Sequence, residues 1–170
     1  MRSAELIGNV AVIVILAFVI FVVVSLVRAV RIVPQSQAYV VERWGRFQAV
    51  MKGGFHLLVP FVDRVAARID LREQVANFPP QPVITADQAM VSIDSVIYFQ
   101  ITDPRSATYE VANFLQAIEQ LTATTLRNLI GSLDLEQTQT SRESINKQLR
   151  GVLDEATGPW CIRVTRVELK

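Results

Sequence analysis

The feature that most constrains this chain is an uninterrupted apolar stretch near its start. Residues 6–27 read LIGNVAVIVILAFVIFVVVSLV and contain no charged side chain. As an α-helix this stretch is about 33 Å long, which exceeds the roughly 30 Å of hydrocarbon in a bilayer. The stretch therefore predicts a single membrane-spanning helix. Residues 1–5 form a short flank before it and residues 28–37 a connector after it.

Two other interpretations of the apolar stretch fit the sequence less well. A helix buried in a soluble core is usually shorter or keeps a polar stripe. A cleaved signal peptide has a shorter apolar region and a small-residue cleavage site, whereas Arg28 and Arg31 follow here. We therefore predict an uncleaved signal anchor in the cell membrane. The residues expected to contact lipid along it are Leu6, Val14, Phe18, Phe21 and Val27.

The basic residues beside the stretch predict its orientation, because Lys and Arg resist translocation. Only Arg2 precedes the stretch, whereas Arg28 and Arg31 follow it closely. We therefore expect the N-terminus outside the cell and the folded domain in the cytoplasm. Arg28 and Arg31 are also expected to contact the lipid surface.

The net charge of +1 hides a strong asymmetry along the chain. Residues 28–72 contain eight basic and three acidic side chains, whereas residues 73–159 contain five basic and eleven acidic ones. A basic first part beside an anionic leaflet would gain on the order of 1 kcal/mol per Lys or Arg. The alternative is chance clustering of solvated charge. No basic stripe interleaved with aromatic residues indicates a nucleic-acid partner.

The period of the apolar residues changes along the folded part. Alternation predicts strands at 38–43, 64–72 and 89–101, and the three prolines within 78–82 predict a rigid corner instead of a strand. After Pro104 the period becomes helical. We predict a short helix there, longer helices starting at Asn113 and Thr140, and a last strand over 160–169. This order indicates an α+β fold with subdomains at 38–82 and 83–170.

The sequence holds few residues that could carry out catalysis. His56 is the single histidine and lies among apolar neighbours, where a packing role is the simplest interpretation. Cys161 lies in a predicted strand, where a buried and inert thiol is expected. We therefore expect no catalytic residue, no cofactor and no metal ligand, and we do not expect an enzyme.

Residues 54–61, which read GFHLLVPF, are a second candidate membrane contact. The segment is too short to span a bilayer, but it follows the anchor and lies among basic residues. Phe55, Leu57 and Phe61 could lie in the headgroup boundary. The alternative is an ordinary buried strand.

Long motifs in this sequence resemble the stomatin branch of the SPFH (band-7) family, to which prohibitin, flotillin and the HflK and HflC proteins also belong. The matching stretches are IVPQSQAYVVERWGRF (32–47), GGFHLLVPFVDRV (53–65), RIDLREQV (68–75), FPPQPVITADQAMVSIDSVIYFQITDP (78–104), LTATTLRNLIGSLDL (121–135), SRESIN (141–146) and PWCIRVTRVELK (159–170). The family normally continues past the last strand into a long helical region, which this sequence does not contain.

The resemblance implies an SPFH domain of two α+β subdomains that attaches to the membrane and self-assembles into a large ring or cage. Such an assembly is a scaffold that organises membrane microdomains around enclosed proteins. Prokaryotic relatives of this kind often pair with an NfeD-type membrane protein. The alternative function is a regulatory subunit that controls a channel or a membrane protease of the FtsH type.

Self-assembly brings acidic second subdomains side by side, so basic groups are needed between them. The candidates for this oligomer interface are Arg127, Arg142, Lys147 and Arg150.

Overall fold

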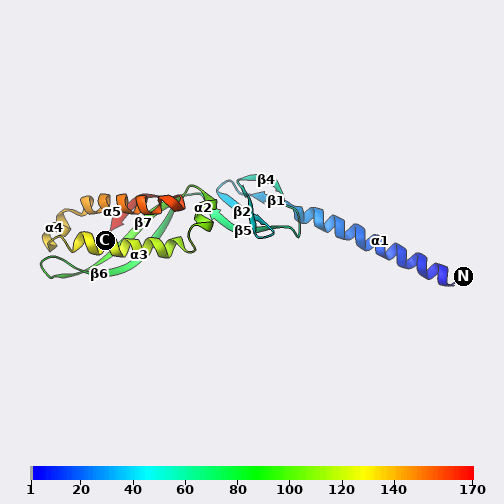
Figure 1. Cartoon of the computed structure of the whole chain (residues 1–170), viewed down its shortest axis with the longest axis horizontal. Coiled ribbons are helices and arrows are strands. Elements are labelled where there is room, and N and C mark those ends of the chain that lie inside the picture. Colours follow the sequence, from blue (N-terminus) through cyan, green and yellow to red (C-terminus); the bar gives the residue numbers. More distant parts are fainter. Residues whose placement is uncertain (1) are drawn as a thin grey trace. The chain divides into compact units, whose positions relative to one another are not determined.

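The computed structural model describes the backbone of residues 2–170 and the side chains of residues 13–170. The chain forms two compact units, Met1–Arg68 and Ile69–Lys170. One long helix and five strands make up most of the first unit, and four helices and three strands make up most of the second (Figure 1). This mixture of helices and strands confirms the predicted α+β class.

Helix α1 (Arg2–Ala29) contains the predicted anchor. From Ile13 to Val27 its side chains are exposed except for half-buried Ser25, which is also the only polar residue in this range. Within the part of the chain whose side chains are described, no helix is both long and apolar enough to cross a membrane. Leu6 lies outside those residues, and the anchor stays a prediction.

The first unit contains a two-stranded ribbon and a three-stranded sheet. The ribbon pairs β1 (Val30–Val33) with β4 (Gly54–Leu57), and the sheet has the order β3-β2-β5, with β2 (Gln37–Arg43), β3 (Arg46–Met51) and β5 (Asp63–Asp70). Strands β2 and β5 confirm the predictions at 38–43 and 64–72, and Arg64 and Arg68 are exposed along β5 as expected. The sequence did not predict β1, β3 or β4 as definite strands.

Two local features shape the sheet of the first unit. Trp44 and Gly45 join β2 to β3 with positive φ angles of 54° and 76°, which is the type I′ geometry that suits the twist of a hairpin. The register of the β2–β3 pair shifts between Val41 and Glu42, where Gln48 of β3 is the extra residue. The consecutive residues Val40 and Val41 are both fully buried, so both faces of β2 are covered at this point.

The second unit is an antiparallel sheet covered by helices. Its strand order is β6-β7-β8, with β6 (Gln74–Ile84), β7 (Met90–Ile101) and β8 (Ile162–Leu169). Its helices are α2 (Pro104–Tyr109), α3 (Phe114–Ile130), α4 (Leu135–Thr140), α5 (Arg142–Thr157) and the 3₁₀ helix η1 (Gly158–Trp160).

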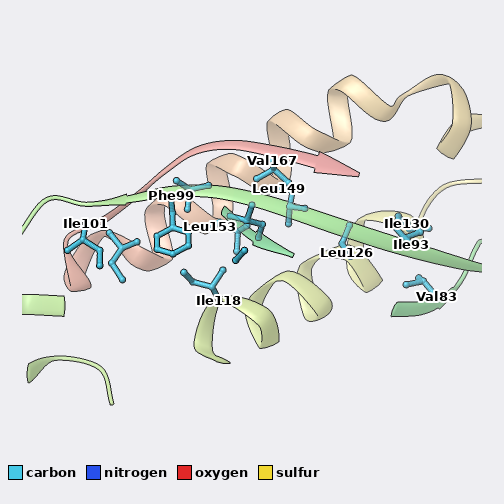
Figure 2. Close-up of a cluster of buried hydrophobic side chains, with 14 of the residues drawn as sticks. Val83, Ile93, Phe99, Ile101, Ile118, Leu126, Ile130, Leu149, Leu153 and Val167 are labelled. Atoms are coloured by element: carbon cyan, nitrogen blue, oxygen red, sulfur yellow. The ribbon is translucent and has the colours of Figure 1, made fainter. Parts of the chain in front are cut away.

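The core of the second unit lies between the sheet and the two long helices. Ile118 of α3 and Leu153 of α5 lie near Phe99 of β7, and all three side chains are at most 1% exposed (Figure 2). Along β7 the odd-numbered residues from Ile93 to Ile101 are buried, which confirms the alternation predicted for 89–101. Burying the apolar stripes of α3 and α5 against this face is what stabilises the unit.

The predicted corner at 78–82 is wrong, because these residues continue strand β6. The order of the sheet makes β6 an edge strand, where a missing N–H can face away from the ladder. Pro79 and Pro80 fall in a register shift opposite Asp94. Asp94 exchanges both of its backbone hydrogen bonds with Lys170 of the chain end instead, at 3.1 and 2.9 Å. The missing N–H groups of Pro79 and Pro80 therefore leave no backbone group of Asp94 without a hydrogen bond.

The structure also corrects the predicted division after Pro82. Strand β6 pairs with β7 from Gln74 to Ile84, so the whole of it belongs to the second unit. The boundary lies between Arg68 and Ile69, near the end of β5.

The predicted helix ends are partly confirmed. The Asn113 side chain accepts a hydrogen bond from the Gln116 N–H at 3.2 Å, and α3 ends just before Gly131. The predicted start at Thr140 is wrong, since Thr140 ends the short helix α4 and α5 begins at Arg142. The last strand begins at Ile162 because Cys161 has a left-handed φ of 53°.

Candidate membrane-contacting and assembly surfaces

One face of the β1–β4 ribbon is apolar and exposed. Val30 lies opposite Leu57, and Ile32 lies opposite Phe55. Directly opposed residues share a face in an antiparallel pair, and so do residues two apart in one strand. These four side chains, which we call the apolar ribbon face, are 39%, 66%, 76% and 63% exposed in the order just given.

The opposite face of the ribbon has a different character. It carries Arg31 opposite His56 and Val33 opposite Gly54. Val33 is only 2% exposed and His56 is half-buried, whereas Arg31 is exposed, so this face is partly covered and the apolar ribbon face is not. A contiguous exposed apolar surface of this kind marks a contact with a membrane or a partner.

The loop after β4 lies along helix α1. The Leu58 N–H donates to the Ala29 carbonyl at 2.8 Å, and the ring of Phe61 stacks on Phe21 with centroids 5.8 Å apart. Phe21 precedes Ala29 by eight residues, or about 12 Å of helix. Phe61 is 78% exposed and has a left-handed φ of 71°. The loop tip therefore presents a strained aromatic residue alongside an apolar part of α1.

An ion pair supports this loop from the sheet. The Arg43 guanidinium donates to both oxygens of Asp63 at 2.7 and 3.1 Å, and the Val59 N–H donates to the same carboxylate at 2.9 Å. The Asp63 side chain is only 4% exposed. Hydrogen bonds from Arg43, and then from Val59, hold the pKa of this carboxyl below its usual value. Asp63 thus remains charged and ties the start of the loop to β2.

The structure gives the predicted lipid-contacting residues a common property. Those with described side chains are all exposed, namely Val14, Phe18, Phe21, Val27, Arg28, Arg31, Phe55, Leu57 and Phe61. Residues 54–61 do not form a buried strand, because Leu58 is the only buried residue among them. Sequence reasoning missed Val30 and Ile32, which were placed in the connector. Their alternation with Arg31 was the available signal.

The four basic residues predicted at an oligomer interface are all exposed in the second unit. Arg127 lies in α3, whereas Arg142, Lys147 and Arg150 lie in α5. Arg142 lines a hollow with Ile145, and the other three do not. The oligomer interface at these residues stays a prediction.

Of the two residues considered for chemistry, His56 has a backbone partner and Cys161 is a free cysteine. The His56 Nε2 atom lies 2.6 Å from the Lys52 carbonyl oxygen. Cys161 is half-buried in the turn before β8, not inside a strand as expected. In the part of the chain whose side chains are described, no group of three or more His, Cys, Asp or Glu residues could hold a metal ion.

Comparison with known proteins identifies relatives over most of the chain. The model of the SPFH domain / Band 7 family matches residues 31–170. An uncharacterized protein of Mycobacterium tuberculosis is 56% identical over 164 residues, which are 96% of this chain and 43% of that protein. A stomatin homolog of Pyrococcus horikoshii is 37% identical over 151 residues, which are 89% of this chain and 56% of that protein.

A mitochondrial relative extends the comparison to animals. Stomatin-like protein 2 of Bos taurus is 39% identical over 138 residues, which are 81% of this chain and 39% of that protein. The chain thus spans about half the length of the curated relatives it matches.

Proposed function

The chain belongs to the SPFH domain / Band 7 family, and from this premise we propose that it is a membrane-anchored, homo-oligomeric scaffold of the stomatin type. Its work is to attach copies of the domain to the bilayer and hold them side by side around other membrane proteins. No step of this function requires catalysis.

The observation that carries this proposal is the apolar ribbon face, which follows helix α1 without a break in the chain. Val30, the first residue of the ribbon, comes directly after Ala29, the last residue of the helix. Four exposed apolar side chains there would be costly in water and favourable in the headgroup boundary. The stacking of Phe61 on Phe21 supports the same placement.

The proposed anchor is residues 6–27, with Arg28 and Arg31 at the cytoplasmic headgroups. Its support is the charge-free sequence and the all-round apolar character of α1 from Ile13 to Val27. If Arg28 lies at headgroup level, Phe21 lies about 10 Å deeper along the helix. Phe61, which stacks on it, would then reach the outer part of the hydrocarbon.

Spin labelling of the full chain in lipid vesicles tests this placement. In a Cys161→Ser background, single substitutions Phe55→Cys and Phe61→Cys each carry one label. We expect frequent collisions of both labels with oxygen, which concentrates in hydrocarbon, and few with a water-soluble nickel chelate.

Trp44→Cys provides the matched control. Trp44 is also an exposed aromatic residue with positive φ in the first unit, but it lies in the β2–β3 hairpin outside the ribbon. Its label should collide mainly with the nickel chelate. Equal nickel accessibility at all three positions would contradict membrane contact by the ribbon and its loop.

A further inference from the structure

A basic hollow lies beside the C-terminal end of helix α1, within the first unit. Arg28 of α1, Arg31 of β1 and Arg68 of β5 line it, together with Phe61 and Asp63. Its volume is about 280 Å³. Pockets for small ligands typically measure about 300 to 1,000 Å³. The hollow lies near the lower end of this range, which leaves room for a phosphate group.

The charge in the hollow is strongly positive. Its one acidic group, Asp63, is already occupied by both hydrogen bonds from Arg43. Among the described residues, neither Arg28 nor Arg31 has an ion-pair partner. The C-terminal dipole of α1 contributes only about half a negative charge. The three guanidinium groups carry more charge than this dipole. The hollow therefore has a net positive charge that an anion would neutralise.

The third arginine is held in place by an aromatic ring. The guanidinium carbon of Arg68 lies 5.3 Å from the centre of the Tyr39 ring. Stacking on a ring orients the plane of a guanidinium and leaves its N–H groups free to donate. Such a fork matches the paired oxygens of a phosphate group.

We propose that Arg28, Arg31 and Arg68 bind the phosphate group of an anionic glycerophospholipid, with its acyl chains lying against the apolar surface at Phe61. This inference rests on the proposed membrane attachment and extends it from a general surface contact to a defined lipid site. Phosphate is the shared chemistry of a lipid headgroup and a soluble phosphate, and the lipid is favoured because Phe61 and exposed α1 adjoin the hollow.

Retention of lipid by the full chain tests the site. The protein is reconstituted in phosphatidylcholine bilayers with a minor fraction of phosphatidylglycerol, and the lipids that remain bound are counted by native mass spectrometry. We expect wild-type protein to retain phosphatidylglycerol in preference to phosphatidylcholine. The Arg31→Gln/Arg68→Gln variant should lose this preference about tenfold or more, since each Arg beside an anionic lipid contributes on the order of 1 kcal/mol.

The control removes the same charge from the same unit outside the hollow. Arg46 and Arg64 are exposed and do not line it, so Arg46→Gln/Arg64→Gln should retain phosphatidylglycerol like the wild type. A second variant, Arg28→Gln/Arg31→Gln, leaves the Arg68–Tyr39 contact in the sheet untouched. It should show the same loss as the first, which excludes misfolding of the sheet as the cause.

Three outcomes would overturn the site. Equal losses of the preference for phosphatidylglycerol in the hollow variants and in the control variant would mean that the charge of the whole surface, and not this site, attracts the lipid. No loss in either hollow variant would mean that these arginines bind no lipid phosphate. Displacement of bound phosphatidylglycerol by inorganic phosphate at similar concentration would assign the hollow to a soluble anion.

Failure of the wild-type chain to stay with the bilayer would contradict the proposed function instead, so the two failures are distinguishable.

Discussion

At the scale of single residues, Asp63 shows how one carboxylate organises the first unit. It accepts hydrogen bonds from Arg43 and from the Val59 N–H, and its side chain is almost fully covered. Asp70 also pairs with an arginine, Arg72, which lowers the pKa of Asp70 to about 2. The Asp70 and Arg72 side chains are 29% and 70% exposed, so solvent screens much of that attraction.

We predict that Asp63→Asn destabilises the first unit at neutral pH. Asparagine leaves Arg43 without a countercharge and weakens the bond to Val59, at a cost of about 1 kcal/mol or roughly 5 °C in Tm. Thermal unfolding followed by circular dichroism measures the change. Asp70→Asn is the control and should shift Tm much less, because its ion pair is exposed. Similar shifts in both variants would contradict the role assigned to the covered pair.

The same variant should change the dependence of stability on pH. The pKa of Asp63 is lower in the folded chain than in the unfolded one, so its stabilisation is complete above the unfolded value of about 4. It is lost as the pH falls through the folded pKa. We therefore expect the Tm difference between wild type and Asp63→Asn to be largest at neutral pH and to shrink below about pH 4. A constant difference down to pH 2 would contradict this.

At the scale of elements, proline is tolerated in a strand where no neighbouring strand needs its missing N–H group. Pro79 and Pro80 of β6 lie on a sheet edge, opposite Asp94 of β7, whose backbone bonds to the other side. Two glycines differ in how much room they leave for a side chain. Gly151 lies in the interior of α5 with open space where a Cβ would stand, whereas a Cβ on Gly53 would lie 2.5 Å from the Gln35 Cα.

We predict that Gly151→Ala stabilises the second unit by about 0.5 to 1 kcal/mol. Alanine reduces the entropy that the helix loses on folding, and the exposed site requires no repacking. Chemical denaturation measures the gain. Gly53→Ala should have the opposite sign, because the backbone near Gln35 has to move. A neutral Gly53→Ala would show that the close approach of these two segments is easily relaxed.

At the scale of the whole molecule, the proposed assembly has to overcome the charge of the second unit. Residues 69–170, which make up this unit, carry thirteen acidic and nine basic side chains. Arg142 and Arg150 lie exposed on α5 and have no ion-pair partner among the described residues. They are therefore available to a neighbouring copy.

We predict that Arg142→Glu/Arg150→Glu reduces the size of particles formed by the full chain in mild detergent. Two reversed charges would turn attraction between neighbouring second units into repulsion. Electron microscopy and light scattering measure the particle size. Arg46→Glu/Arg64→Glu makes the same charge change in the first unit and should leave assembly intact. Unchanged particles after the α5 substitutions would contradict this interface.

The sequence predicted those parts of the fold that depend on local pattern. Alternation identified β5 and β7, and Asn113 marked the start of α3, because period and capping act within a few residues. It failed at residues 78–82 and at Thr140. Whether a proline is tolerated depends on the edge position of its strand, and α4 is too short for a clear period.

The sequence by itself determined the family, the α+β class and the apolar, charge-free stretch at 6–27, since these follow from motifs and composition. Only the tertiary structure decided that residues 30–33 pair with 54–57. That pairing joins segments more than twenty residues apart, and nothing local specifies its register. It turns two short apolar segments into one exposed face beside helix α1, and Arg68 comes from a third segment to complete the basic hollow.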